Sequence, residues 1–225
     1  MNLNQIAVIG DCHALRLIKY NYLNTNDVRL TIWSKSGLRF NHKFGFDPNH
    51  LFINDAISDE IKFSMLDNSN YNTNSAIKFS KIENKGIIIF WLGYVDIKDF
   101  VFVNSEKDYY EILNSSILNI KKYFNNSKIM FIEPIPQFNS FAPNKVQLKS
   151  ELDYSLRVKQ NDLFIKILKK VCKENNIEIL ISQNEIIECM GKKKITKEDA
   201  INDKVGGLLP EYCKKIYDLL ISKLS

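Results

Sequence analysis

A cysteine stands between an aspartate and a histidine near the start of the chain, in Gly10-Asp11-Cys12-His13. A thiol can act as a nucleophile and an imidazole as its base, so Cys12 and His13 are candidates for nucleophilic catalysis. Each residue also has a structural interpretation. Cys12 could pack a tight turn, His13 could bond locally, and Asp11 could brace the turn by accepting backbone N–H bonds.

The surrounding residues predict where this motif lies. Four apolar residues, Ile6 to Ile9, precede Gly10 and predict a strand that is buried on both faces. After Gly10 the apolar residues follow at helical spacing, which predicts a helix over 14–23. Cys12 is therefore expected on a strand-to-helix turn at the carboxyl edge of a parallel sheet, where open α/β folds place ligands and nucleophiles.

The remaining elements predict a three-layer α/β/α sandwich. Further strands are expected over 28–33, 86–92, 129–132 and 177–181, and further helices over 106–124, 153–174 and 208–224. Strands that alternate with helices predict a doubly wound, five-stranded parallel sheet in a single domain, 1–225. Residues 41–58, with His42 and His50, are expected to form an irregular rim. Residues 59–83 remain ambiguous, and 182–200 are expected to be an irregular insertion with the lysines 192–194.

Composition argues against several classes of protein. Hydrophobic residues make up 45% and charged residues 25%, as in ordinary soluble domains. No apolar run approaches the ~18 residues of a membrane span, and no secretory leader pattern is seen, so we expect a cytoplasmic protein. The four cysteines lack CxxC spacing, which predicts neither a disulfide framework nor a metal site. The net charge of +5 comes without an aromatic-plus-basic motif, so we expect no nucleic acid partner.

Four short motifs, in this order, resemble the blocks of the SGNH/GDSL hydrolase superfamily. Gly10-Asp11-Cys12 is similar to the Gly-Asp-Ser of the first block, and Gly37 to the oxyanion glycine of the second. Gly93-Tyr94-Val95-Asp96 resembles the Gly-x-Asn-Asp of the third block, and residues 203–206 resemble the terminal Asp-x-x-His. The resemblance implies the flavodoxin-like SGNH topology, with Cys12 as nucleophile and Asp203 as the catalytic acid.

The same resemblance implies a binding role for several neighbours of Cys12. The backbone N–H groups of Cys12 and Gly37 would form the oxyanion site. Asp11, Gly93 and Asp96 would line the substrate site. Asp96 could also orient Cys12 or the adjacent loop, or pair with Lys98, and Asp203 could instead cap the last helix.

Three positions depart from the family pattern. Cys12 replaces the serine, Val95 the oxyanion asparagine and Gly206 the histidine, and no histidine follows His50. A serine hydroxyl needs an adjacent base, whereas a thiol, with a pKa of about 8.5, ionises more easily at a helix N-terminus. The loss of the histidine is therefore chemically consistent with the change to cysteine. His42 or His50 could serve as a surrogate base, or be ordinary surface residues.

Two functions follow from the resemblance. The first is an acyl esterase or acyltransferase that acts on a carbohydrate of a surface polysaccharide through Cys12. The second is a protein of the same fold that binds a glycan or nucleotide-linked ligand without catalysis. The first turn also resembles the Gly-Asn-Cys-Gln of WcbI-like capsule-biosynthesis proteins, which implies coenzyme A or acyl-coenzyme A as a ligand, although hydrolysis requires no cofactor. The sequence leaves the oligomeric state open.

Overall fold

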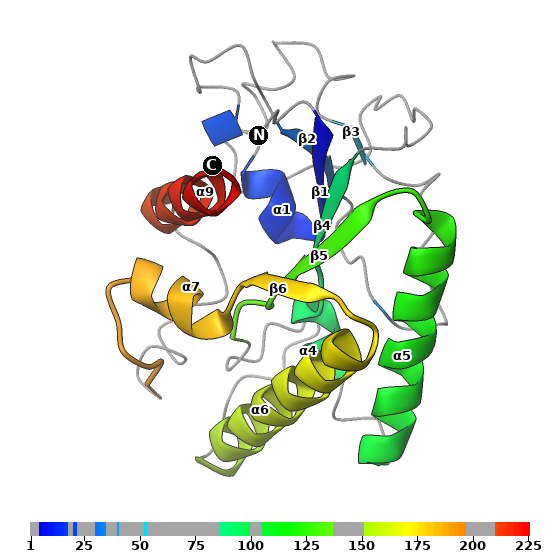
Figure 1. Cartoon of the computed structure of the whole chain (residues 1–225). Coiled ribbons are helices and arrows are strands. Elements are labelled where there is room, and N and C mark those ends of the chain that lie inside the picture. The colour runs from blue at the N-terminus through cyan, green and yellow to red at the C-terminus, as the bar shows by residue number, and fades with distance from the viewer. Residues whose placement is uncertain are drawn as a thin grey trace.

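A sheet covered by helices on both faces forms the centre of the structure (Figure 1). The computed structural model describes residues 5–17, 20–21, 30–34, 40, 52–53, 86–99, 105–136, 151–196 and 210–225. The strands within these ranges are β1 (Ile6–Gly10), β2 (Thr31–Ser34), β3 (Phe52–Ile53), β4 (Ile87–Trp91), β5 (Lys128–Ile132) and β6 (Glu178–Ile181). Their order in the sheet is β3-β2-β1-β4-β5-β6.

Five of these strands form the parallel sheet that the sequence predicts. Strands β2, β1, β4, β5 and β6 pair in parallel with their neighbours, which confirms the five-stranded parallel arrangement. Strand β3 is an addition, because its two residues pair antiparallel with β2 at the edge of the sheet. The prediction that 41–58 are irregular is therefore wrong for residues 52–53. Two residues carry too little periodicity to predict a strand.

The central strands are apolar throughout because helices cover both of their faces. Every residue of β1 is buried, and so are four of the five residues in β4 and in β5. Side chains alternate between faces, so Ile6 and Val8 belong to one core while Ala7 and Ile9 belong to the other. This double burial is the reason that the strands are readable as continuous apolar runs.

The helices divide between these two cores (Figure 1). Residues of α1 (Cys12–Arg16), α7 (Gln183–Cys189) and α9 (Pro210–Leu224) pack in the core that contains Val8. Residues of α4 (Tyr94–Asp99), α5 (Glu106–Tyr123) and α6 (Glu151–Glu174) pack in the core that contains Ile9. The predicted helices over 106–124 and 153–174 are confirmed, and the last helix is described from residue 210 onward.

Helix α7 contradicts the prediction that 182–200 are irregular for residues 183–189, whereas residues 190–196 form no helix or strand, as predicted. The Ser182 hydroxyl accepts a hydrogen bond from the Glu185 N–H, and the Glu185 carboxylate accepts one from the Ser182 N–H. This reciprocal capping box is a sequence signature of a helix start, Ser-x-x-Glu before apolar residues. The buried side chains of Ile186 and Ile187 then pack the helix against the core. The signal was present in the sequence at Ser182.

No helix within the described ranges is both long enough and apolar enough to cross a membrane.

Candidate active site

At the turn from β1 into α1, the backbone of Gly10 packs closely against α1 and against the neighbouring strand β4. A Cβ atom on Gly10 would lie 2.5 Å from the Ala14 Cβ and 2.7 Å from the Trp91 carbonyl oxygen, so only glycine fits here. The Asp11 N–H donates to the same Trp91 oxygen at 3.4 Å. Cys12 is the first residue of α1. The chain therefore places the backbone of Cys12 at the carboxyl end of the central strand, as predicted.

Asp11 and His13 form a compact buried pair on this turn. The Asp11 Oδ1 atom accepts the His13 backbone N–H at 2.9 Å and lies 2.9 Å from the His13 Nδ1 atom. Both residues are only 1% exposed. A carboxylate can only accept hydrogen bonds, so this contact holds the ring proton on Nδ1 and the lone pair of the neutral ring on Nε2. Asp11 thus braces the turn and orients the imidazole.

Two aromatic side chains, one at the end of β4 and one at the start of α4, pack against the His13 ring. Its centroid lies 4.3 Å from that of Tyr94 in an edge-to-face arrangement and 6.1 Å from that of Trp91. Trp91 is a core residue, as predicted, and Tyr94 is also buried. The imidazole is therefore in contact with a carboxylate of its own chain segment and with two rings from the end of β4 and the start of α4.

Gly93 and Asp96 occupy the junction that follows β4. Gly93 has a φ of 111°, and a Cβ there would lie 2.8 Å from the Phe164 ring, so its backbone and its surroundings both require glycine. Both carboxylate oxygens of Asp96 lie 3.1 Å from the Phe40 nitrogen and accept its N–H. The structure therefore brings Gly93 to the same edge of the sheet as Asp11, and it engages Asp96 with the backbone of a distant segment.

Three other cysteines are described, and all have raised thiol pKa values. Burial raises the pKa of Cys172 to about 12, with a further contribution from the charge of Glu133. Burial likewise raises the pKa of Cys213 to about 11, although Arg16 opposes the shift. The half-buried Cys189 also has a raised pKa, again mainly through desolvation. These thiols remain protonated at neutral pH and are poor nucleophiles.

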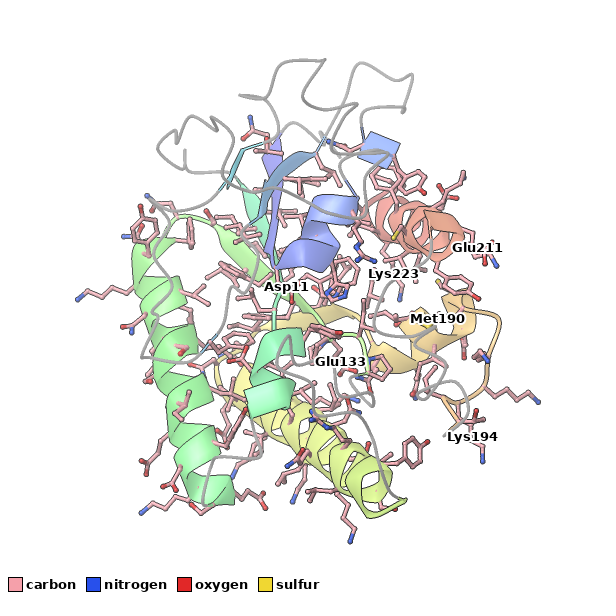
Figure 2. The ribbon with its side chains drawn as sticks, turned by 180° about the vertical axis from the view of Figure 1, so that it is seen from behind. Asp11, Glu133, Met190, Lys194, Glu211 and Lys223 are labelled. Carbon is pink, nitrogen blue, oxygen red and sulfur yellow. The ribbon has the colours of Figure 1, made fainter. Side chains whose placement is uncertain are left out.

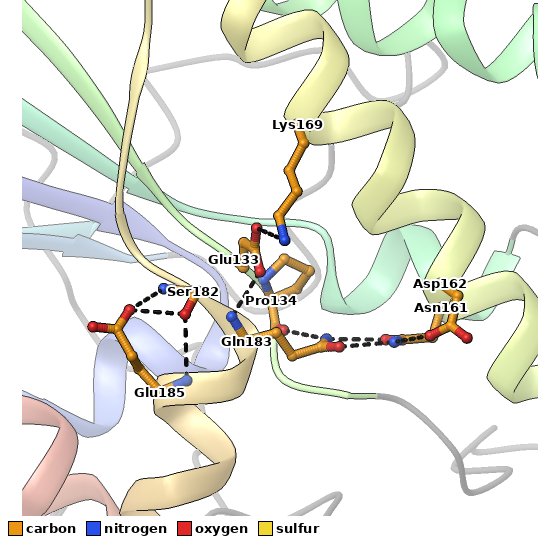
Figure 3. Close-up of polar contacts among 8 residues, drawn as sticks. All are labelled: Glu133, Pro134, Asn161, Asp162, Lys169, Ser182, Gln183 and Glu185. Carbon is orange, nitrogen blue, oxygen red and sulfur yellow. Dashed lines mark hydrogen bonds and ion pairs between the residues drawn. The ribbon is translucent and has the colours of Figure 1, made fainter. Parts of the chain in front are cut away.

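A second polar cluster, which the sequence did not predict, lies at the ends of β5 and β6 (Figure 3). Glu133 follows β5, is 1% exposed, and accepts the Gln183 backbone N–H at 2.7 Å. The other carboxylate oxygen lies 3.2 Å from the Lys169 ammonium. The only sequence signal for this contact is a glutamate directly after a buried strand.

The side-chain amides of Asn161 and Gln183 complete this cluster (Figure 3). Asn161 Nδ2 donates to Gln183 Oε1 at 2.8 Å, and Gln183 Nε2 donates to Asn161 Oδ1 at 3.0 Å and to the Pro134 carbonyl at 2.8 Å. Both protons and the oxygen of the Gln183 amide are thus engaged within the protein. The cluster joins α6, α7 and the segment after β5. Its hydrogen bonds hold these three elements together, and we call the cluster a structural clamp.

Other predicted site residues lie outside the described residues: Gly37, His42, His50 and Asp203. Their assignments stay predictions. Within the described ranges, no group of three or more His, Cys, Asp or Glu side chains is arranged to hold a metal ion. The described part of the site therefore consists of the β1–α1 turn, the Asp11–His13 pair, and Gly93 and Asp96 beyond β4.

Comparison with known proteins shows a shared fold. No protein-family model and no curated protein matches the sequence. Among solved structures, the acetyl xylan esterase AlAXEase is 11% identical with a TM-score of 0.50, and the match covers 98% of this chain and 100% of that one. A second solved structure is 12% identical with a TM-score of 0.56, over 100% and 98% of the two chains. A lipase/acylhydrolase from Enterococcus faecalis is 12% identical with a TM-score of 0.49, over 97% and 94%.

The predicted α/β fold is confirmed by the matches to AlAXEase and to the second structure. The parallel sheet with its flanking helices has the fold of these two structures over essentially the whole chain.

Proposed function

We propose that the chain transfers acyl groups through Cys12, as an esterase or acyltransferase of the SGNH fold that acts on a carbohydrate. The observation that carries this proposal is the buried Asp11–His13 pair, whose two members flank Cys12 in the sequence at the carboxyl end of β1. This edge is where ligands bind in parallel α/β sheets. A fold shared with esterases supports an ester or thioester as the substrate.

In the proposed reaction His13 takes the proton of the Cys12 thiol. The thiolate attacks the carbonyl carbon of the ester, so that a C–S bond forms and the C–O bond to the leaving alcohol breaks. The imidazolium returns the proton to the departing alkoxide. In hydrolysis, His13 then deprotonates a water that attacks the thioester, and the thiolate leaves; in acyl transfer, a sugar hydroxyl replaces the water. Asp11 keeps the His13 proton on Nδ1 throughout and stabilises the imidazolium.

The remaining roles follow the resemblance to the family. The backbone N–H groups of Cys12 and Gly37 would donate to the oxyanion, and Asp203 would bind a substrate hydroxyl or orient the site. Val95 supplies no amide in place of the family's asparagine, so this oxyanion site has one donor fewer. We therefore expect a slower acylation than a complete SGNH site would give, by about 10²–10³-fold.

The substrate class is supported by one named structure and by the chemistry of the nucleophile. AlAXEase is an acetyl xylan esterase, which makes an acetylated sugar a reasonable substrate to test. A thiol also exchanges acyl groups readily with thioesters, so acetyl-coenzyme A is the acyl donor to test for transfer to a sugar hydroxyl. The proposed activity requires no bound cofactor.

Turnover of p-nitrophenyl acetate, and of acetyl-coenzyme A with sugar acceptors, tests the proposal. The Cys12→Ala variant should lose turnover, while Cys189→Ala should retain it because the Cys189 thiol lies on α7 and has a raised pKa. Equal rates for wild type and Cys12→Ala would remove Cys12 from the mechanism.

A second candidate function is ligand binding without catalysis. It is favoured by Val95 and Gly206, which stand where the family has its oxyanion asparagine and its histidine. In this case Cys12 would titrate like a free thiol, with a pKa at or above about 8.5. The pH dependence of its alkylation by iodoacetamide distinguishes the two functions, because a catalytic thiolate would react well below that pH.

A further inference from the structure

The rings of His13 and Tyr94 meet because two neighbouring strands end at the same level of the sheet. Strands β1 and β4 pair in parallel with Gly10 opposite Trp91. His13 and Tyr94 each lie three residues beyond this pair. The Asp11 N–H donates to the Trp91 carbonyl oxygen, which extends the contact between the two segments past the last residue of β1. The starts of α1 and α4 are therefore neighbours at the carboxyl edge of the sheet.

The junction between β4 and α4 sets where the Tyr94 ring lies. Only Leu92 and Gly93 separate Tyr94 from the end of β4. The Gly93 carbonyl oxygen accepts the N–H of Ile97 at 2.9 Å, and Ile97 is fully buried, so the first turn of α4 is tied to the core. Tyr94 itself is 7% exposed and packs in the core that contains Trp91. The ring is thus positioned by the strand before it and by the core around it.

Tyr94 contacts the His13 ring from a different direction than Asp11 does. The hydrogen bond between Nδ1 and the Asp11 carboxylate, at 2.9 Å, locates one atom of the imidazole. Hydrogen bonds tolerate a range of angles, so the ring can still tilt about this bond. The Tyr94 ring lies 4.3 Å away, centroid to centroid, with an interplanar angle of 70°, an edge-to-face geometry that aromatic pairs favour. The Trp91 ring lies farther away, at 6.1 Å.

We propose, as an extension that rests on the proposed function, that Tyr94 is a positioning residue of the acyl-transfer site. Its ring limits the tilt of the His13 imidazole, so that Asp11 and Tyr94 together define one orientation for the transfer of the Cys12 proton. Proton transfer requires a base in the correct geometry, and an imidazole that tilts more freely spends less time in that geometry. Tyr94 acts through His13 and not on the substrate, so its loss should lower kcat more than it raises KM.

Three substitutions of Tyr94 test this role. Tyr94→Leu removes the ring and should lower kcat for p-nitrophenyl acetate by about 10–100-fold, with KM within about threefold of wild type. Tyr94→Phe retains the ring and should keep kcat within about threefold of wild type. Tyr94→Met fills the space with a flexible chain in place of a ring, and it provides a second ringless variant where Tyr94→Leu does not fold.

The matched control is Tyr217→Leu. Tyr217 is a buried tyrosine of the same core, 5% exposed, and its ring lies beside that of Tyr20. This variant removes a ring of the same size from the core, so it should also lower the melting temperature, but it should leave kcat within about twofold of wild type. All rates are measured well below the melting temperature of each variant.

The motion of the His13 ring gives a readout that does not depend on turnover. The chain has three histidines, so the ring signals of His13 are assigned by their absence from the spectrum of His13→Gln. Carbon-13 relaxation of these signals gives an order parameter for the ring. It should fall in Tyr94→Leu and Tyr94→Met and stay near the wild-type value in Tyr94→Phe and Tyr217→Leu.

The two readouts separate the role of Tyr94 from the proposed function. A wild type without turnover would contradict the proposed function, and the order parameters would still decide whether Tyr94 holds the imidazole. An order parameter that is unchanged in Tyr94→Leu and Tyr94→Met would overturn the inference. So would an equal fall of kcat in Tyr94→Leu and Tyr217→Leu, or a fall in Tyr94→Phe as large as in Tyr94→Leu.

Discussion

Two places along the same edge of the sheet use a buried carboxylate in different ways. Asp11 follows β1 and Glu133 follows β5; both are 1% exposed, and both accept a backbone N–H (Figure 2). The partner of Asp11 is His13, two residues along the chain, whereas the partner of Glu133 is Gln183, 50 residues away. The first contact orients a side chain, and the second joins two elements of the fold.

From this difference we expect the polar residues after β1 to serve the proposed reaction and those after β5 to serve the stability of the fold. At the β5–β6 end, hydrogen bonds of the Asn161 and Gln183 amides join α6, α7 and the segment after β5, so this cluster is a structural clamp. At the β1–β4 end, the polar groups lie beside a cysteine and fix one imidazole between a carboxylate and Tyr94. We therefore expect substitutions in the cluster after β5 and β6 to lower the free energy of unfolding. Substitutions at the turn after β1 should instead lower the rate of turnover.

His13→Gln should produce the largest effect. Removal of the imidazole should lower kcat/KM for p-nitrophenyl acetate by about 10²–10⁴-fold, because general acid–base catalysis contributes that much. The matched variant Asp11→Asn keeps an oxygen that can accept the His13 N–H but no longer fixes the ring proton on Nδ1 by charge, so its rate should fall between those of wild type and His13→Gln. Steady-state kinetics on variants with native circular dichroism measure this. A folded His13→Gln protein with the wild-type rate would exclude His13 as the base.

Glu133→Ala should have the largest effect on stability. It leaves the Gln183 N–H buried without its acceptor, which costs about 2–3 kcal/mol of unfolding free energy. The Lys169 side chain is 54% exposed and can be hydrated, so its loss of partner adds little. Urea unfolding measures the change, and Glu178→Ala, in an exposed pair with Lys128, provides the control at about 0–0.5 kcal/mol. Equal costs for the two variants would remove the special role of the clamp.

The amide pair should show a positive coupling energy. Asn161→Ala removes two hydrogen bonds from the buried Gln183 amide and should cost about 1–3 kcal/mol. Gln183→Ala should cost at least as much, because the bond to the Pro134 carbonyl is lost too. In the double variant the costs should fall short of their sum by about 1 kcal/mol or more, since neither amide is left unpaired. Additive costs would show that the two side chains act separately.

The smallest predicted effect is a pH dependence at the contact between α7 and α9. The hydrogen bond from Lys223 is the main cause that lowers the pKa of Glu185 from 4.5 to about 2, with help from Ser182. Because the pKa of Glu185 is lower in the folded state, its ionised form stabilises the protein at pH values above about 4.5. This stabilisation is lost as the pH falls from about 4.5 toward about 2. Lys223→Met should therefore cost up to about 1 kcal/mol at neutral pH and progressively less in acid. A cost that stays constant with pH would contradict the assignment.

The sheet was predictable from the sequence because its strands are apolar on both faces. Runs such as Ile6 to Ile9 and Ile87 to Trp91 have no polar positions, and helical spacing between the runs requires parallel strands. The capping box at Ser182 also predicts the start of α7, although residues 182–200 are predicted above to be an irregular insertion with the lysines 192–194. Sequence patterns therefore predict the helices and strands that depend on continuous burial or on capping by nearby residues.

The polar contacts of the site were not predictable in the same way. The partner of Asp96 is Phe40, and the ring beside His13 belongs to Tyr94, so both contacts depend on how distant segments pack. Periodicity carries no information about such pairs. Tyr109, whose hydroxyl bonds the Asp96 carbonyl, is likewise recognisable only after α4 and α5 are placed. By contrast, the Asp11–His13 contact spans two residues and was open to prediction.

The most direct measurement is to trap and locate the acyl group. Protein treated briefly with p-nitrophenyl acetate and quenched in acid is digested and mapped for a thioester that hydroxylamine removes at neutral pH. The proposal predicts an acetyl thioester on Cys12 and none on Cys172 or Cys213, whose thiols are protonated by virtue of pKa values of about 12 and about 11. Hydrolysis of the ester by wild type without a thioester on Cys12 would contradict the proposal. So would a Cys12→Ala variant that forms a thioester at another cysteine and hydrolyses the ester at the wild-type rate.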